Sequence, residues 1–457
     1  MRNLVFALLA ASFGASGATV EKMFGRQMWP WATHFEVSYV LKTLPNEAVD
    51  ISLKVSAADC EYVIPASELL GETVGLTSGE YKIVWDSTAS SFPTESWLKA
   101  NSDKLKFGIV TTPSKSAAEY LIVDLSGGST APSWPSRRIV GRPYEGWSDE
   151  YKTTKLVLRR IFAGGEGDVF SSDDKVSFMF GCDSGPDQQH KGSLDFDAVE
   201  AHFTNDYWIG VFELTQKQYQ LITGTSVEPA QFAKGDTYPQ SNIGYCTHMR
   251  GDKEGYKWPK SSDVDPESLM GKLRAKVVLP AEIPSEWKFD LPTEAQWEYA
   301  CRAGTKGPWN NGSTYDVYIY NETKKYEGDH NLDLIGWNPA NCGAGGKPVG
   351  MKIANAWGLY DMHGNAAEYC LDYNSANNHP EGGFEPKGRS LSSGTTASSP
   401  RVVKGGSYSS EWTSISSHKY WKGHRSCAHV KTYDGDAKAY ITCRITLRNS
   451  AENADRQ

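Results

Sequence analysis

The chain has little that would tie it to a bilayer or to nucleic acid. Beyond its N-terminus, no stretch approaches the roughly 18 consecutive apolar residues that a membrane-spanning helix needs. Lys and Arg number 47 against 55 Asp and Glu, a net charge of −8, and no long basic run occurs. We therefore expect no transmembrane segment in the mature protein and no nucleic-acid partner.

Cysteine is also scarce, with eight residues in 457 and none in a CxxC pair. So sparse a set does not indicate the framework of a disulfide-rich domain. An even count in an exported protein permits bridges, and free buried thiols are an equally good interpretation. The sequence does not choose between them.

The N-terminus carries the one sustained apolar run. Arg2 precedes the run at residues 4–11, and the small residues 15–18 follow it. This order is typical of a secretory signal peptide cleaved after Ala18; the alternative is a buried N-terminal helix. We expect a protein that is secreted, or that lies in the periplasm or cell envelope.

Aromatic residues make up 12% of the chain, and its length suits two or three globular domains. Apolar and polar residues alternate in short segments separated by turn residues, which predicts a β-sandwich over residues 19–128. Residues 129–148 contain three prolines and no clear periodicity, so they are expected to form a linker. Trp29-Pro30-Trp31 is interpreted as a packing element, with a ligand platform as the alternative. The expected strands are 34–43, 49–55, 81–85, 105–111 and 120–125.

A second domain is expected over residues 149–449, followed by a polar tail at 450–457. Thr215 with Gln218, and Thr293 with Gln296, have the spacing of capping boxes, so each pair predicts a helix start. The second helix is expected to end near Gly304. The long loops between these elements are typical of segments that bind ions or partners.

Four blocks occur in order: FELTQKQY at 212–219, LPTEAQWEYA at 291–300, GLYDMHGN at 358–365 and VKGGSY at 403–408. Together they make residues 155–449 resemble the formylglycine-generating (sulfatase-modifying) factor superfamily. The resemblance implies an irregular α+β domain of C-type-lectin-like fold. The N-terminal segment is similar to all-β sandwich domains that precede such domains in some secreted bacterial proteins.

The resemblance implies a calcium site. In relatives, two side-chain oxygens and two backbone carbonyls of the third block surround the ion, as suits a hard cation. Alternatively, the two acidic residues brace the turn without metal. The matching positions are Asp361, Gly364, Ala366 and Glu368.

The copper site of the superfamily's oxidases is not matched. There, two cysteines five residues apart follow the Gly-Gly-Ser block and bind Cu(I) through soft thiolates. The matching positions here are Ser410 and Ile415, and isoleucine has no donor atom. Copper is therefore not expected, and we lean against assigning an enzyme.

Two further sets of residues lie near the fourth block. His418, His424, Cys427 and His429 could bind zinc or copper, although their spacing matches no standard zinc pattern; the alternative is a solvated loop. The second set combines rigid aromatic with adaptable polar side chains, as recognition loops do, unless the rings are inward anchors. It consists of Ser407, Tyr408, Trp412, Tyr420 and Trp421.

The leading interpretation is a secreted binding or interaction protein, for a glycan or a protein, on a scaffold that lacks the copper-binding cysteine pair. One alternative is a sulfatase-modifying oxidoreductase or another diverged enzyme in the same cleft, with Cys427 or Cys443 as the reactive thiol. Another is a structural accessory of the cell envelope.

Overall fold

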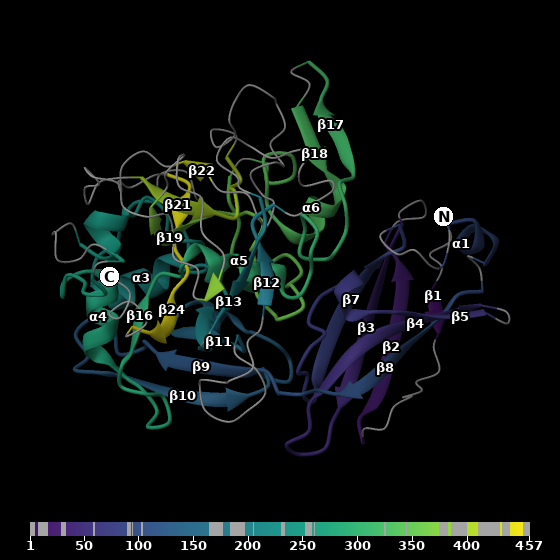
Figure 1. Ribbon diagram of the computed structural model, residues 1–457, viewed down its shortest axis with the longest axis horizontal. Coiled ribbons are helices and arrows are strands. Elements are labelled where there is room, and N and C mark those ends of the chain that lie inside the picture. Colours follow the sequence, from purple (N-terminus) through teal and green to yellow (C-terminus); the bar gives the residue numbers. More distant parts are fainter. Residues whose placement is uncertain are drawn as a thin grey trace.

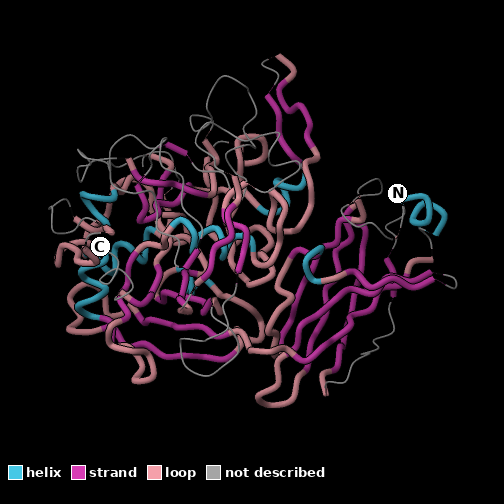
Figure 2. Tube along the Cα trace, viewed as in Figure 1, coloured by secondary structure: helices cyan, strands magenta, loops and turns pink. Residues whose placement is uncertain are grey.

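A computed structural model shows an N-terminal β domain packed beside a larger mixed domain with few helices and much irregular backbone (Figure 1 and Figure 2). The described residues are 5–7, 17–28, 33–57, 60–88, 93, 95–101, 104–163, 177–182, 197–203, 205–229, 234–251, 258–259, 261–323, 326–343, 345–373, 383–384, 400–409, 430–431 and 439–450.

The N-terminal domain consists of two antiparallel sheets, one ordered β1-β2-β3-β7-β6 and the other β5-β4-β8. The expected alternation is present: Val49, Ile51 and Val55 of the central strand β4 face inward and are buried. The predicted N-terminal all-β domain is therefore confirmed, but the strand expected at 120–125 belongs to the large sheet of the second domain and not to the sandwich. The elements are β1 (Val5–Ala7), β2 (Thr19–Gln27), β3 (His34–Lys42), β4 (Val49–Ala57), β5 (Cys60–Ile64), η1 (Ala66–Glu68), β6 (Leu69–Leu70), β7 (Gly79–Asp86), α1 (Glu95–Asn101) and β8 (Lys106–Pro113).

Strand β1 lies inside the predicted signal peptide, at one edge of its sheet. Its partner β2 also pairs with β3, in a register that runs from Thr19↔Lys42 to Gln27↔Phe35. Removal of residues 1–18 would therefore leave β2 paired along its other side.

The expected linker differs from the structure. Strand β10 (Trp134–Val140) occupies the middle of residues 129–148 and pairs with β9 (Glu119–Asp124). Both belong to a seven-stranded sheet of the second domain, ordered β15-β10-β9-β11-β14-β24-β16. The prolines of this segment favoured a linker because proline cannot donate a hydrogen bond to a neighbouring strand. Pro135, however, lies at the start of β10, where proline is tolerated.

The rest of the second domain consists of short elements and loops, most of which lie above strands β9 and β10 in this view (Figure 2). Its smaller sheets are β12-β13-β20, the hairpin β17-β18 and β22-β21-β19-β23. The elements are η2 (Asp149–Lys152), β11 (Lys155–Ile161), β12 (Ser177–Phe180), β13 (Val199–His202), β14 (Tyr207–Gly210), α3 (Gln216–Thr223), η3 (Tyr245–Met249), α4 (Leu269–Lys276), β15 (Val277–Val278), β16 (Trp287–Asp290), α5 (Glu294–Arg302), β17 (Val317–Asn321), β18 (Tyr326–Asp329), α6 (His330–Ile335), β19 (Ala367–Tyr373), β20 (Gly383–Phe384), β21 (Arg401–Lys404), β22 (Val430–Lys431), β23 (Ile441–Thr442) and β24 (Thr446–Asn449).

Both predicted capping boxes are confirmed. The hydroxyl of Thr293 accepts from the backbone N–H of Gln296 at 3.2 Å, and the Gln296 side chain accepts from Thr293 N at 3.1 Å. The same reciprocal pair starts α3 at Thr215. Helix α5 ends at Arg302, beside a left-handed Ala303 and close to the predicted end. None of the helices in the described ranges is long and apolar enough to cross a bilayer.

The two domains share a packed junction. Leu70 and Val84 of the N-terminal domain lie in one apolar cluster with Trp309, Leu332 and Ile335. Backbone bonds also cross the junction: Gly71 N donates to Ala354 O at 3.0 Å, and Thr73 N donates to Ala356 O at 3.1 Å. We infer that the domains are held together by packing and by regular hydrogen bonds.

Gly71, which donates across this junction, also lies close to strand β7 of its own domain. Its φ is +100°, and an added Cβ would lie 2.3 Å from the carbonyl oxygen of Lys82. We expect Gly71→Ala to lower the free energy of unfolding by about 1–3 kcal/mol, because backbone and carbonyl must both shift. Urea unfolding measures the effect. The matched control is Gly108→Ala, whose Cβ would meet only the Lys54 side chain at 3.6 Å; equal losses in both variants would contradict the conclusion that position 71 requires glycine.

Candidate functional site

The block at residues 358–365 forms a tight, buried turn before β19. Asp361, Gly364 and Asn365 all have positive φ, at 58°, 119° and 82°. Left-handed backbone favours Asp, Asn and Gly, which explains the residue types found here. The Asp361 carboxylate accepts from Gly350 N at 2.7 Å through Oδ2. Its other oxygen, Oδ1, is buried and has no hydrogen-bond partner among the described residues.

Two more carboxylates face this turn. Glu213 accepts from Ala366 N at 2.7 Å and from the Asn365 amide at 2.8 Å. Glu368 accepts from Trp297 Nε1 at 2.7 Å and from Arg444 at 2.7 Å. We call Glu213, Asp361, Glu368 and Arg444 the acidic cluster; all four are buried.

The acidic cluster contains three carboxyl groups and one guanidinium. Burial is the largest influence on Asp361 and raises its pKa to about 6. Burial also raises the pKa of Glu213 well above its usual range, and the nearby charges of Asp361 and Glu368 add to this effect. The cluster therefore has more negative than positive charge to accommodate, which favours protonation or a bound cation.

The predicted calcium residues fit a cation in part. The unbonded Asp361 Oδ1 is the kind of oxygen that a hard cation takes. Both oxygens of Glu368, however, already accept hydrogen bonds from Arg444. No three His, Cys, Asp or Glu side chains in the described ranges converge at metal-binding distance. An ion would thus bind beside Asp361, while Glu368 stays with Arg444.

Arg444 holds this region together. Its guanidinium donates to Gly210 O and to Tyr360 O, each at 2.8 Å, as well as to Glu368. These bonds join the end of β14, the turn block and strand β19. The resemblance drew attention to Glu368, but its partner lies 76 positions away and carries no local sequence signal.

The Gly-Gly-Ser block is built into the same region. Ser407 is 0% exposed, and its Oγ accepts from Ser409 N at 3.2 Å. Tyr408 is 7% exposed, and its backbone N–H donates to Asn365 O at 3.1 Å. Both side chains were predicted to belong to a recognition surface, and both are buried; for Tyr408 this is the inward orientation that was the alternative.

The other predicted residues of this region lie outside the described residues, as do Trp29-Pro30-Trp31 and most of the predicted signal peptide. Their predicted roles in copper loss, recognition and metal binding consequently remain predictions. They are Ser410, Trp412, Ile415, His418, Tyr420, Trp421, His424, Cys427 and His429.

Seven cysteines lie in the described ranges, and no disulfide joins any two of them. Burial raises the pKa of Cys342, Cys370 and Cys443, so these groups stay protonated near neutral pH. The thiol of Cys342 lies closest to the fourth block, with its Sγ 3.4 Å from Tyr408 O. Cys443, the candidate thiol of the enzyme alternative, is fully buried.

A second buried ionic group lies behind the site and was not predicted. The ammonium of Lys404 is 3.0 Å from Glu298 Oε2, and Glu298 Oε1 is 2.8 Å from Arg302. Glu298 and Arg302 are one turn apart in α5, and Lys404 ends β21. Their spacing in a helix is visible in the sequence, but charged residues at that spacing ordinarily indicate a solvated face.

Comparison with known proteins matches residues 177–432 to the family model of the Sulfatase-modifying factor enzyme 1-like domain. The chain belongs to this family. The Chaperone protein LppX of Paenibacillus barcinonensis is 33% identical over 193 residues, which cover 39% of this chain and 65% of that protein. The Formylglycine-generating enzymes of Mus musculus and Thermomonospora curvata are 33% and 34% identical, each over 26% of this chain and over 30% and 38% of their own lengths.

The chain thus spans less than two thirds of the length of these curated relatives. Among solved structures, Treponema denticola variable protein 1 gives a TM-score of 0.39 at 20% identity, covering 64% of this chain and 95% of that one. PvdO from Pseudomonas aeruginosa gives a TM-score of 0.40 at 16% identity, covering 60% and 92%. The predicted α+β fold class with an N-terminal β domain is confirmed by the arrangement of strands and helices.

The pH dependence of stability tests the acidic cluster. In the folded protein burial raises the pKa of Asp361 from 3.8 to about 6, so between these values the folded chain binds more protons than the unfolded chain. Stability therefore falls as the pH rises through this window, and the cost persists above it. In chelator, we expect Asp361→Asn to be more stable than the parent at pH 7 by roughly 1–3 kcal/mol and no more stable at pH 4.

Urea titrations at several pH values measure this difference. Asparagine suits the variant because it tolerates positive φ and keeps an oxygen for Gly350 N. A stability difference that stays constant between pH 4 and pH 7 would show that Asp361 carries no buried charge.

Proposed function

We propose that this protein is a binding protein, for a protein or glycan ligand, that keeps the family scaffold without its formylglycine-forming chemistry. The observation that carries the proposal is the occupancy of the two copper-ligand positions by Ser410 and Ile415. A serine hydroxyl is a hard, protonated donor and isoleucine has none, so Cu(I) has no thiolate pair at this place.

The state of the other thiols supports the same proposal. A substitute copper site would need two accessible cysteines that form thiolates. The thiols of Cys342 and Cys443 are buried with raised pKa values, which disfavours both metal binding and nucleophilic attack. The enzyme alternative therefore has no reactive thiol among the described residues close to the Gly-Gly-Ser block.

The similarity to the Chaperone protein LppX favours a protein ligand. Chaperones act by binding other proteins, and a diverged scaffold can keep such a role after catalysis is lost. We place the contact surface on the loop that contains Trp412, Tyr420 and Trp421, because aromatic residues dominate binding energy at interfaces. We further propose that the protein is exported through its N-terminal signal, because Arg2, the apolar run at 4–11 and the small residues 15–18 have the order of a signal peptide.

Calcium forms part of the proposal. The unbonded oxygen of Asp361 and the excess negative charge of the acidic cluster would both be satisfied by a divalent cation. The backbone of Gly364 and Ala366 is the remaining donor set that the family resemblance implies. Calcium would then stabilise the turn that precedes β19 and support the loop beyond residue 409.

We expect calcium to raise the melting temperature of the parent protein. A ligand that binds only the folded state adds about 2.7 kcal/mol of stability at a hundredfold excess over its Kd. Asp361→Asn should lose this response because it lacks the second anionic oxygen. Thermal unfolding with calcium, magnesium or chelator measures the effect; identical curves for the parent in all three conditions would remove calcium from the proposal.

We expect Trp412→Ala and Trp421→Ala each to weaken ligand capture by about 2 kcal/mol, as loss of an interface tryptophan does. The parent chain, immobilised and exposed to an extracellular protein fraction and to a glycan array, identifies the ligand. Trp97→Ala, on α1 of the N-terminal domain, is the matched control. Unchanged capture by both folded loop variants would place the contact surface elsewhere.

We expect no conversion of a Cys-X-Pro-X-Arg peptide to its formylglycine form by reduced, copper-loaded protein in air. Mass spectrometry detects the reaction as loss of the thiol to an aldehyde. Turnover that disappears with a copper chelator would restore the enzyme alternative.

A further inference from the structure

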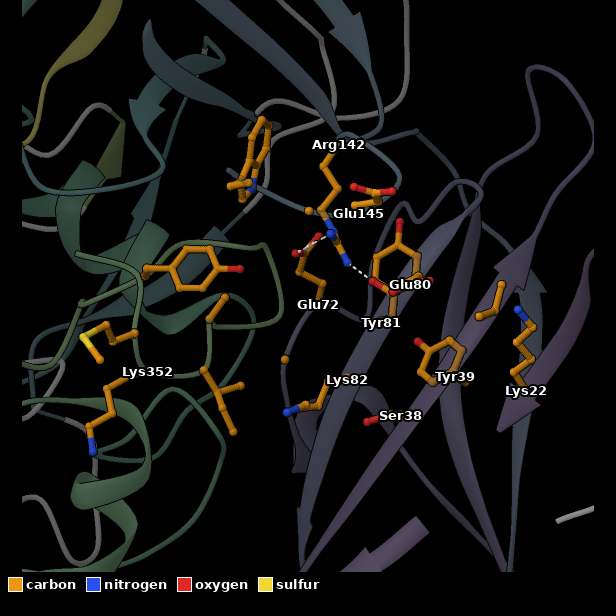
Figure 3. Close-up of a pocket in the computed structure, with 18 residues that line it drawn as sticks. Lys22, Ser38, Tyr39, Glu72, Glu80, Tyr81, Lys82, Arg142, Glu145 and Lys352 are labelled. Atoms are coloured by element: carbon orange, nitrogen blue, oxygen red, sulfur yellow. Dashed lines mark hydrogen bonds and ion pairs between the residues drawn. The ribbon is translucent and has the colours of Figure 1, made fainter. Parts of the chain in front are cut away.

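A cavity of about 570 Å³ lies at the junction of the two domains, away from the Gly-Gly-Ser block. One wall is the face of the N-terminal sheet that β3 and β7 present, including Tyr39 and Tyr81. The other wall comes from residues 351–354 and Tyr360 of the second domain (Figure 3). Its volume lies within the range of small-molecule sites in proteins.

A buried ion pair forms part of the lining. Arg142 Nε lies 3.0 Å from Glu72 Oε1, and the two side chains are only 9% and 8% exposed. The guanidinium also donates to the backbone carbonyl of Glu80 and lies 4.3 Å from the ring centre of Tyr81. These contacts fix the position of both charged groups, and the Glu72 carboxylate keeps acceptor capacity beyond this one partner.

Two polar groups of the lining are unsatisfied. Within the described part of the chain, the Tyr39 hydroxyl and the Trp147 indole N–H have no hydrogen-bond partner. Tyr39 is 2% exposed, and burial raises its pKa well above the usual range, so the hydroxyl can both donate and accept. Buried polar groups are rarely left without partners, so these two indicate an occupant with its own hydrogen-bonding groups.

The charges around the cavity are balanced. Lys82 pairs with Glu36 at 3.2 Å. Lys352 lies across the cavity with its ammonium directed away from the sheet (Figure 3), where it donates to Asp333 O and lies 4.0 Å from the Trp337 ring centre. Arg142 is paired as well, and the remaining charged residues of the lining, Lys22, Glu80 and Glu145, add one positive and two negative charges. The lining therefore has no surplus of positive charge, which disfavours a phosphate or another anion.

We propose that this junction cavity binds a neutral carbohydrate, a short oligosaccharide. A sugar hydroxyl can both donate and accept a hydrogen bond. It can donate to the carboxylate of the Glu72–Arg142 pair, accept from the Trp147 N–H, and do either with the Tyr39 hydroxyl. The apolar faces of sugar rings match the tyrosine and tryptophan side chains of the walls. This site is separate from the loop of the proposed function and goes beyond it.

Because the cavity has walls from both domains, a bound saccharide contacts both. The sugar is then a ligand of the assembled chain and not of either domain alone. It also adds stability to the junction, since a ligand specific for the folded state shifts the unfolding equilibrium.

The test uses the full chain on an array of neutral, sialylated and sulfated glycans, followed by calorimetric titration with the strongest neutral binder. Tyr39→Phe removes only the unbonded hydroxyl. We expect it to bind the sugar roughly tenfold more weakly, the worth of one hydrogen bond. Its melting temperature without sugar should be no lower than that of the parent, because no protein partner is lost.

Tyr62→Phe is the matched control, since Tyr62 lies on β5 in the other sheet and outside the cavity lining. Equal affinity in Tyr39→Phe and Tyr62→Phe would overturn the proposal. So would a preference for charged glycans, or no binding of any neutral glycan on the array. Trp412→Ala and Trp421→Ala should bind the neutral sugar normally, so failure here and failure of the proposed function give different results.

Discussion

The second domain depends on one buried guanidinium. Arg444 donates to Glu368, to Gly210 O and to Tyr360 O, and so connects strand β19, the end of β14 and the turn block through one fully buried side chain. An unpaired buried charge is costly, so each partner must be in place for the others to be tolerated. This requirement explains why the turn block keeps its form independently of what occupies the cleft beside it.

The residues that the fold needs for packing differ from those that copper chemistry needs. The family blocks at 291–300, 358–365 and 403–408 supply a capped helix, a left-handed turn and a glycine pair, and all of these are needed for packing whatever the site does. Copper chemistry, by contrast, needs only two thiolates, at positions now held by Ser410 and Ile415. Under the proposed function, loss of copper chemistry would leave these packing elements in place.

Much of this architecture was predictable where the signal is local. Alternation in residues 49–55 predicted β4, and the Thr293–Gln296 spacing predicted the start of α5. Strand β10 was missed because Pro135 and the adjacent Arg137 and Arg138 break the alternation, and the strand is ordered by its pairing with β9. The Arg444–Glu368 pair joins residues 76 positions apart, and the Tyr39 hydroxyl has no partner among the described residues because of how the chain packs around it. Residue spacing in the sequence encodes neither feature.

The central claim is that the buried ion pair between Glu368 and Arg444 holds the second domain together. A double-mutant cycle on these two residues tests this claim most directly. We predict that Arg444→Met and Glu368→Gln each lower the free energy of unfolding by about 3–5 kcal/mol, the cost of leaving one buried partner unpaired. The double variant should lose far less than the sum, because it removes the unpaired charge. Additive losses would contradict the account, since they would mean that the two side chains contribute independently.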